Sequence, residues 1–480
     1  MTGPPARTAP LWTSAEAEAA TEGHSTRPWT ATGVSIDSRS LLPGDLFVAI
    51  KGPRTDAHDF LEDAFARGAA AAMVSRIPRE YANGAPLLIV DDTYSGLKKL
   101  ARAARGRTRA GVVGVTGSVG KTSTKEALAM ALRASGRVAA TEGNLNNMWG
   151  VPLSLARMPA DSDYGVFEIG MNHAGEITPL ARLVRPRIAI VTTIEAVHIE
   201  FFESLEGIAR AKAEIFDGMD RAGVAVLNAD NPYFDVLAAR AKARGIGRVV
   251  GFGAREDADA RLVSFTPDGP SKVEAVVMGE ALAFPLALPG RHSALNAMAV
   301  LAAVKLLGAD LRAGAEALGA MDPPAGRGRR LAVRPASGGT AMLIDDSYNA
   351  SPASMRAAFL VLAHSRPGPG GRRIAVLGDM LELGQGSARA HAALADDLLA
   401  ANVDLVLTTG PNMMHLDDAL PRARRGGHTS RAGELAPLLS GLLRDGDVVL
   451  VKGSHSQRLG AVVSALAMPA GDARPAANGN

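Results

Sequence analysis

The sequence predicts an α/β protein of three domains, and three observations support this fold class. The chain has 480 residues, which is too long for one compact hydrophobic core. Short apolar runs alternate with helical segments, and this order favours largely parallel sheets. The segment Asp322–Arg330, D-P-P-A-G-R-G-R-R, interrupts the alternation and is typical of a linker between domains.

An N-terminal α/β domain is expected over residues 1–108, with a disordered tail at residues 1–10. Thr13 fits the N-cap of a short helix that ends before Gly23. Pro43-Gly44 fits a turn between two short strands. The other expected elements are strands at residues 68–74 and 87–90 and a helix at residues 93–105, before a junction at residues 106–109.

Two further domains of the same class are expected. The central domain, over residues 109–328, is P-loop ATPase-like with a mostly parallel sheet, and the C-terminal domain covers residues 329–480 with a disordered tail from about residue 469. Ser351-Pro352 fits the N-cap and first position of a helix in the last domain. The expected strands are residues 111–115, 163–169, 188–193, 224–227, 341–344, 374–377, 405–409 and 448–451, and the expected central helices are residues 125–134 and 292–307.

The composition is that of a soluble globular protein, with 47% apolar and 21% charged residues. The net charge is +3, no basic stripe is concentrated in the sequence, and aromatic residues make up only 4%, so nucleic-acid binding is not implied. The absence of cysteine excludes disulfides, thiolate metal sites and a cysteine nucleophile. The longest apolar run, residues 297–304, is far below the ~18 residues that span a bilayer. We therefore expect a soluble, cytoplasmic protein without stable membrane insertion.

The stretch Gly114–Ala127, G-V-T-G-S-V-G-K-T-S-T-K-E-A, is a candidate phosphate-binding loop because it lies between a predicted strand and a predicted helix. Lys121 is expected near the β- and γ-phosphates, and Thr122 is expected to offer a hydroxyl ligand to Mg²⁺. The usual pattern has glycine where Val115 stands, and the glycines here give G-x-x-G-x-x-G-K-T instead. The expected ATP-binding residues of the loop are Thr116, Gly117, Ser118, Val119, Gly120, Lys121 and Thr122.

Three residues after the loop are candidate Mg²⁺ ligands, and each also has an ordinary structural interpretation. Glu168 and His198 each lie at the carboxyl side of a predicted strand, where ligands of parallel sheets gather, but they also fit a capping glutamate and a structural histidine. Lys212 alone fits an exposed helix lysine. If Lys212 faces Mg²⁺, it has to be neutral or converted to an anion, for example by carbamylation.

Hydrolase signatures are absent from the sequence. The segment from Val451, V-K-G-S-H-S, places Ser454 beside His455, but adjacency in sequence is not triad geometry, and neither G-x-S-x-G nor H-E-x-x-H occurs. Three uses of a bound nucleotide stay open from the residues alone: joining two molecules, phosphorylating a substrate as a P-loop kinase does, or regulation without catalysis.

Eight motifs together resemble the Mur ligases of peptidoglycan synthesis, and the resemblance covers about Leu11 to Leu466. Two of them, D-D-S-Y-N-A and G-D-M-x-E-L-G, are most similar to the family member that joins D-alanyl-D-alanine to UDP-N-acetylmuramoyl-tripeptide. The motifs are T-G-S-V-G-K-T from Thr116, G-N-L-N-N-M-W-G-V-P from Gly143, E-I-G-M-N-H-A-G-E-I from Glu168, A-K-A-E-I-F from Ala211, L-P-G-R-H-S-A-L-N-A from Leu288, D-D-S-Y-N-A-S-P from Asp345, L-G-D-M-L-E-L-G from Leu377 and V-K-G-S from Val451.

The resemblance implies an ADP-forming amide ligase that uses ATP and Mg²⁺ and passes through an acyl phosphate. Its substrates are then UDP-N-acetylmuramoyl-tripeptide and D-alanyl-D-alanine, and we expect a monomer. The N-terminal domain is expected to hold the UDP end of the substrate, the central domain to bind ATP, and a Rossmann-like C-terminal domain to close over both. A family ligase that adds a single amino acid is the nearest alternative, followed by a P-loop kinase.

The resemblance also implies roles for individual residues. Catalytic roles fall to Lys121, Glu168, His198 and Lys212, and the implied metal ligands are Thr122, Glu168, His198 and Lys212 as its carbamate. Nucleotide contacts beyond the loop fall to Asn296, Arg327 and Asp346. Substrate contacts fall to Ser38, Arg39, Asn144, Asn146, Asn147, Tyr348 and Asn349.

Two positions depart from the family's patterns. Many relatives carry Arg after K-G-S, where this chain has His455. The D-N-P at Asp230–Pro232 is similar to the signature of the ligase that adds the third residue, but Tyr233 stands where that signature needs Arg. We therefore interpret Asp230–Pro232 as a turn.

Overall fold

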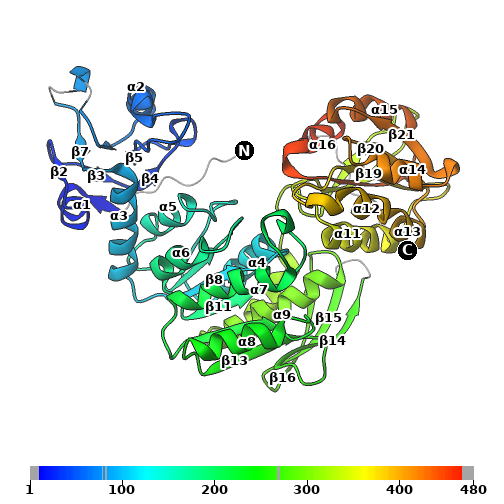
Figure 1. Cartoon of the computed structure of the whole chain (residues 1–480), viewed down its shortest axis with the longest axis horizontal. Coiled ribbons are helices and arrows are strands. Elements are labelled where there is room, and N and C mark those ends of the chain that lie inside the picture. Colours follow the sequence, from blue (N-terminus) through cyan, green and yellow to red (C-terminus); the bar gives the residue numbers. More distant parts are fainter. Residues whose placement is uncertain (1–9, 78, 82–83, 268–270, 468–480) are drawn as a thin grey trace.

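The computed structural model describes residues 10–77, 79–81, 84–267 and 271–467, and it confirms the predicted α/β class (Figure 1). Three units follow one another along the chain, each built on its own main sheet. The N-terminal and C-terminal units lie on opposite sides of the central unit (Figure 1). The tails expected at residues 1–10 and from about residue 469 lie outside the described residues, apart from Pro10. The boundaries at residues 108 and 328 stay predictions.

The N-terminal unit contains a five-stranded sheet and a separate strand pair. The sheet has the order β2-β7-β6-β5-β4, in which β4 to β7 run parallel and β2 is antiparallel. Thr13 forms the predicted cap through a reciprocal capping box with Glu16. The elements are β1 (Trp12–Thr13), α1 (Ser14–Thr21), β2 (His24–Ser25), β3 (Thr30–Ala31), β4 (Gly33–Ser35), β5 (Asp45–Val48), α2 (Leu61–Ala66), β6 (Ala71–Val74), β7 (Leu87–Ile89) and α3 (Thr93–Arg107).

The central unit contains a nine-stranded sheet of order β16-β15-β14-β13-β12-β11-β8-β10-β9. The strands β14-β13-β12-β11-β8-β10-β9 are parallel. Strands β15 and β16 extend the β14 edge as an antiparallel meander. The strands are β8 (Gly111–Thr116), β9 (Val138–Ala140), β10 (Tyr164–Glu168), β11 (Ile188–Val191), β12 (Val224–Asn228), β13 (Arg248–Gly253), β14 (Ala260–Thr266), β15 (Ser271–Val277) and β16 (Glu280–Leu286). Strands β9 and β13 to β16 were not predicted from the sequence.

Helices cover both faces of the central sheet, so its inner strands are apolar on both sides. One apolar core joins α4 and α9 to the sheet, and a second joins α5 to α8 to the opposite face. The helices are α4 (Lys121–Arg133), α5 (Gly150–Ala156), α6 (Ile177–Val184), α7 (Leu205–Lys212), α8 (Phe234–Ala243), α9 (Arg291–Leu306) and α10 (Leu311–Ala317). The helix predicted from residue 125 begins at Lys121, because Gly120 forms its N-cap in a left-handed conformation (φ 85°).

The C-terminal unit contains a six-stranded sheet of order β17-β18-β22-β19-β20-β21, parallel except for β17. The four predicted strands are present, and Ser351 caps α11 with Pro352 in the first turn, as predicted. Arg329 and Arg330, expected in the linker, pair with β18 as the start of β17. The elements are β17 (Arg329–Val333), β18 (Ala341–Asp346), α11 (Pro352–His364), β19 (Arg373–Gly378), α12 (Ser387–Ala392), α13 (Leu394–Ala400), β20 (Leu405–Thr409), α14 (Met414–Ala419), β21 (Arg425–Thr429), α15 (Leu435–Leu442), β22 (Val448–Lys452) and α16 (Gly460–Leu466).

The N-terminal unit is attached to the central unit through α5. The Trp12 indole donates a hydrogen bond to the Ala156 carbonyl (2.9 Å), and the Arg157 guanidinium donates to the Val34 carbonyl (2.7 Å). Leu153 and Ala156 belong to the same apolar core as α3. In the part of the chain that the structure describes, no helix is long and apolar enough to span a bilayer.

The buried His391 makes the stability of the C-terminal unit depend on pH. Its Nε2 accepts the Met380 N–H (2.9 Å) and its Nδ1 donates to the Ser387 carbonyl (2.7 Å), so the neutral ring is fully bonded. Burial lowers the pKa of His391 from its usual value of 6.5. As the pH falls below about 6.5, His391 binds a proton in the unfolded chain but not in the folded chain. The free energy of unfolding therefore falls.

We expect His391→Gln to remove this part of the pH dependence, because glutamine can donate and accept but does not titrate. The slope that His391 contributes is at most about 1.4 kcal/mol per pH unit. Urea unfolding of both proteins from pH 7.5 to pH 5 checks this, and parallel slopes would contradict it.

Candidate active site

A cavity of about 360 Å³ lies where the phosphate-loop edge of the central sheet meets the C-terminal unit. Fourteen of the predicted site residues line it: Ser118, Val119, Gly120, Lys121, Thr122, Asn144, Asn146, Glu168, His198, Asn296, Arg327, Asp346, Tyr348 and Asn349. Thr116, Gly117, Asn147 and Lys212 are not among its lining residues, and Ser38 and Arg39 lie in the N-terminal unit. Residues far apart in sequence meet here because β10, β8 and β11 end at one edge, against which α9, the linker and the C-terminal unit place their own side chains.

The loop after β8 has backbone conformations and close contacts at two glycines that leave no room for a Cβ atom. Gly117 (φ 142°) lies against Thr192, whose hydroxyl oxygen would be 1.9 Å from a Cβ at this position. Gly120 (φ 85°) lies against Asn296, whose Nδ2 would be 2.7 Å from a Cβ. Gly114, in contrast, lies within β8 and packs against Ile215 and Pro186. Gly117 and Gly120 are thus the glycines that shape the loop, and Gly114 allows close packing beneath it.

Lys121 begins α4 and holds its ammonium group inside the loop. Its Nζ donates to the carbonyl oxygens of Gly117 (2.8 Å) and Ser118 (3.3 Å). Desolvation in the cavity lowers the pKa of Lys121, while the nearby Glu168 carboxylate opposes this shift. The N-terminus of α4 adds partial positive charge at the same place. The loop therefore presents positive charge to any anion that enters the cavity.

Glu168 ends β10 directly beside the loop and is buried, so it is not a surface glutamate. Asn146 donates its side-chain N–H to Glu168 Oε1 (2.6 Å). The other oxygen, Oε2, is buried and has no hydrogen-bond partner within the described residues. A buried carboxylate oxygen without a partner is costly unless a cation or a ligand supplies one.

Lys212 ends α7 and is only 2% exposed, so the exposed-lysine interpretation is wrong. Burial lowers the pKa of Lys212 well below its usual value, and repulsion by Lys121 lowers it further. The neutral amine of Lys212 is therefore favoured more than that of an exposed lysine. A neutral amine is nucleophilic, whereas an ammonium is not.

His198 also lies close to both lysines. Partial burial lowers the pKa of His198, and the charges of Lys121 and Lys212 act in the same direction, while the Glu382 carboxylate raises it. The ring pairs through Nδ1 with Glu382, which belongs to the C-terminal unit. Among the described residues, no group of three or more His, Asp or Glu side chains is arranged to hold a metal ion by itself.

Two buried lysines near the cavity were not predicted from the sequence to have a role in the site. Lys452 ends β22 opposite Asp346 in the parallel register, and its Nζ donates to Asp346 Oδ2 (2.7 Å) and to the Asn349 carbonyl (2.9 Å). Lys125, one turn after Lys121, donates to the carbonyls of Thr141 (2.7 Å) and Gly143 (3.4 Å) and pairs with Glu126. The sequence held one signal for each residue. Lys452 ends an apolar strand, and Lys125 lies inside a helix that begins at a phosphate loop.

Lys125 fixes the segment that carries the candidate substrate residues Asn144 and Asn146. The loop from Thr141 to Asn147 is bonded to α4 through Lys125 and to the segment after β10 through the Gly170 N–H, which donates to the Asn146 carbonyl (2.8 Å). Asn147 has a structural role in this loop, since its side-chain oxygen accepts the N–H groups of Trp149 and Gly150 at the start of α5.

At the C-terminal side of the cavity, Tyr348 contacts both a guanidinium and an imidazole. The Arg327 guanidinium lies 4.2 Å from the centre of the Tyr348 ring, and the Tyr348 and His455 rings are 5.1 Å apart. The linker is held to β18 because the N–H of Gly326 donates to Asp345 Oδ2 (2.8 Å). The linker and the C-terminal unit thus meet the cavity together. Asp230 and Asn231 lie in the predicted turn, away from the lining residues.

Ser38 and Arg39 follow β4 at the carboxyl edge of the N-terminal sheet. Ser38 is buried, whereas the Arg39 side chain is largely exposed and pairs with Asp37 (2.7 Å). Parallel sheets bind ligands at this edge. Their assignment to the UDP end of a substrate stays a prediction.

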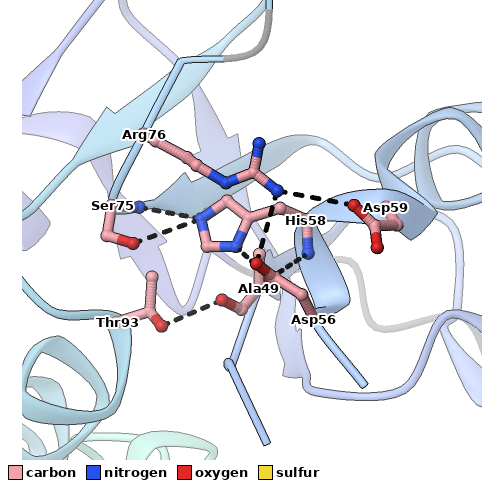
Figure 2. Close-up of polar contacts among 7 residues, drawn as sticks. All are labelled: Ala49, Asp56, His58, Asp59, Ser75, Arg76 and Thr93. Carbon is pink, nitrogen blue, oxygen red and sulfur yellow. Dashed lines mark hydrogen bonds and ion pairs between the residues drawn. The ribbon is translucent and has the colours of Figure 1, made fainter. Parts of the chain in front are cut away.

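A polar cluster at the same edge contains the residue types of a hydrolytic triad, but it is bonded as a structural cluster (Figure 2). The buried His58 pairs through Nδ1 with Asp56 (2.6 Å), while its Nε2 accepts the backbone N–H of Ser75 (3.0 Å). The single lone pair of Nε2 is then already used, and the Ser75 hydroxyl is 3.4 Å away. His58 therefore ties the loop after β5 to the end of β6 and does not activate Ser75.

Three parts of the chain match families of known proteins. Residues 30–105 match the "Mur ligase family, catalytic domain", residues 115–304 the "Mur ligase middle domain", and residues 329–455 the "Mur ligase, glutamate ligase domain".

Similar proteins cover nearly the whole chain. The UDP-N-acetylmuramoyl-tripeptide–D-alanyl-D-alanine ligase of Escherichia coli is 39% identical over 442 residues, which cover 91% of this chain and 94% of the relative. That of Rickettsia prowazekii is 34% identical over 431 residues, covering 90% and 94%. Crystal structures of MurF from Acinetobacter baumannii (TM-score 0.82, 28% identity, covering 96% and 99%) and of MurF ligase from Thermotoga maritima in complex with ADP (0.75, 28%, 90% and 96%) are similar in fold.

We predict that Lys125→Met loosens the loop from Thr141 to Asn147. Hydrogen bonds from a charged donor each contribute roughly 1.5–3 kcal/mol, so amide hydrogen exchange in this loop should accelerate at least roughly tenfold. Lys305→Met is a matched control, because Lys305 bonds the carbonyls of Val277 and Met278 in the same manner but outside the cavity. Unchanged amide hydrogen exchange in residues 141–147 of the Lys125 variant would contradict the role of Lys125 in holding this loop.

Proposed function

The chain belongs to the Mur ligase family, and on this premise we infer that it joins D-alanyl-D-alanine to UDP-N-acetylmuramoyl-tripeptide, converting ATP to ADP. The product is the UDP-muramoyl-pentapeptide of peptidoglycan synthesis. The observation that carries this function is the cavity lined jointly by the phosphate loop and by the segment Asp346–Ser351 of the C-terminal unit. The phosphate loop can bind a nucleotide, and the segment of the C-terminal unit can hold a second reactant beside it.

The chemistry needs a chain that holds three anions together. A carboxylate resists attack by an amine because its oxygen is a poor leaving group and its charge repels electrons. Transfer of the γ-phosphoryl group to the terminal carboxylate of the tripeptide breaks the bond to ADP and forms an acyl phosphate. The amine of D-alanyl-D-alanine then attacks the acyl carbon, phosphate leaves, and the amine proton passes to solvent or to a nearby base.

The phosphate loop and Lys121 supply positive charge where the phosphates meet the carboxylate. The ammonium of Lys121 lies within hydrogen-bond distance of the loop carbonyls and can exchange these partners for phosphate oxygens. Preorganised charge of this kind stabilises a transition state because little reorganisation is needed during the reaction. Alignment of the reactants supplies a further share, up to about 7–11 kcal/mol for well-oriented groups.

We propose that Mg²⁺ binds beside the loop. The unpartnered Glu168 Oε2 fits this, since it is a hard oxygen donor in a buried position. Thr122, His198 and a carbamate on Lys212 are the other proposed ligands. When bound, Mg²⁺ neutralises phosphate charge and orients the transferred group.

Lys212 has the environment that carbamylation requires. Its lowered pKa favours the neutral amine, whose nitrogen can attack carbon dioxide, form an N–C bond and lose a proton. The product is an anion, which removes the repulsion between Lys212 and Lys121 and adds oxygen donors. We propose that this carbamate is the active form of Lys212.

The remaining assignments rest on the family and are also proposals. The UDP end of the substrate is assigned to the N-terminal unit near Ser38 and Arg39, and the nucleotide contacts to Asn296, Arg327 and Asp346. Substrate contacts are assigned to Asn144, Asn146, Asn147, Tyr348 and Asn349. The partners are these small molecules, and we propose a cytoplasmic monomer.

Release of phosphate from ATP is expected only when both UDP-N-acetylmuramoyl-tripeptide and D-alanyl-D-alanine are present, with formation of an amide. The assay pairs tripeptides ending in diaminopimelate or lysine with a panel of single amino acids and dipeptides, and mass spectrometry identifies the products. A stable phosphorylated product would favour a kinase, a single amino acid as the preferred amine would favour another Mur ligase, and nucleotide binding without turnover would favour regulation.

Lys212→Ala is expected to lose most activity, at least roughly a hundredfold, because the carbamate oxygens are lost. Short carboxylic acids added at millimolar concentration should restore part of it by supplying oxygen donors in the vacated space. The matched control is Lys242→Ala, which removes a lysine from the neighbouring helix α8 outside the cavity. Full activity of the Lys212 variant would contradict the proposal that a carbamate on Lys212 is needed for the reaction.

A further inference from the structure

A close side-chain contact between two units joins the candidate metal ligand His198 to Glu382. His198 follows β11 in the central unit, and Glu382 follows β19 in the C-terminal unit. The imidazole Nδ1 and Glu382 Oε2 form the contact. The His198 side chain is largely enclosed (20% exposed), whereas that of Glu382 is partly open to solvent (40% exposed).

Both partners have left-handed backbone conformations, which side chains other than glycine rarely adopt. The φ angle is 59° at His198 and 62° at Glu382. Only seven non-glycine residues in the described ranges have positive φ, and two of the seven face each other in this contact. Such conformations persist where surrounding contacts impose them, and they concentrate at functional sites.

Neighbouring contacts hold the two segments together. The Glu200 N–H donates to the Glu382 carbonyl (3.4 Å), and Gly384 lies against Glu200. On the other side, the Leu381 N–H donates to the Ser454 hydroxyl (3.0 Å), which fixes the segment to the end of β22. The contact is therefore built from backbone and side chains and is not a chance meeting of two flexible side chains.

The pair leaves one nitrogen of His198 for another partner. Nδ1 lies against Glu382 Oε2, although the two atoms do not form an aligned hydrogen bond, so Nε2 is the ring nitrogen left to bind a cation. Histidines that bind metals usually give their other N–H to a carboxylate or carbonyl, which fixes the tautomer and the ring orientation. His198 also lines the cavity that contains Glu168 and the phosphate loop.

We propose that Glu382 is a positioning residue, which orients His198 for cation binding only while the C-terminal unit lies against the central unit. This inference rests on the proposed role of His198 as a metal ligand. It gives the C-terminal unit a part in the metal site although none of its own side chains binds the ion. Since the coupling is reciprocal, a bound cation also favours the assembled arrangement of the two units.

The test measures Mn²⁺ binding to the full chain in the presence of ADP, by electron paramagnetic resonance of free Mn²⁺. Glu382→Ala should weaken Mn²⁺ binding roughly tenfold or more, the range found for residues that orient metal ligands. Glu382→Gln, whose side-chain oxygen can still accept the Nδ1 proton, should recover part of this loss. ADP affinity in the presence of EDTA should stay unchanged in both variants.

Two further variants separate the possible causes. Glu200→Gln removes a negative charge two residues from His198 while keeping the backbone N–H that bonds Glu382, and it should bind Mn²⁺ as the unmodified chain does. His198→Ala should weaken Mn²⁺ binding by itself. If His198→Ala has no effect, both the metal-ligand role and the present inference fail. If His198→Ala weakens binding but Glu382→Ala does not, or if Glu200→Gln weakens it equally, only the positioning role of Glu382 fails.

Discussion

The parallel pairing of β8 with both β10 and β11 is the constraint on which the site depends. This register places Glu168 opposite Val115 and Val191 opposite Thr116, so the three strands end at one edge. The phosphate loop, the Glu168 carboxylate and the wall that Gly117 touches follow directly from that alignment. A shift of two residues in any one of these pairs would move a reacting group by about 7 Å, which is too far for phosphoryl transfer.

Two lysines, Lys121 and Lys212, lie close to each other beside the phosphate loop. Burial lowers the pKa of both, and the charge of Lys121 lowers the pKa of Lys212 further. Lys452 is balanced by Asp346, and Lys125 by Glu126 and backbone carbonyls. Lys121 lies inside the loop, close to the Glu168 carboxylate. Its charge suits a site that binds a triphosphate and a carboxylate.

The C-terminal unit completes the site by several contacts. Asp346 and Tyr348 line the cavity, Arg327 is held over the Tyr348 ring, and Glu382 pairs with His198. Each of these contacts joins residues of different units or of the linker. Such contacts between units can keep water away from the reactants. This matters because an acyl phosphate hydrolyses in an open site.

The sequence by itself determined the local features: the phosphate loop between strand and helix, the caps at Thr13 and Ser351, the main strands, the α/β class and the family. These depend on neighbours in the chain, on glycine conformations and on periodicity. The tertiary structure alone decided that Lys212 is buried, that Glu168 Oε2 has no hydrogen-bond partner among the described residues, that Lys452 meets Asp346 and that Glu382 meets His198. Burial and charge pairing depend on which strands become neighbours and where the units meet, and residues separated by 22 to 184 positions carry no local sign of that.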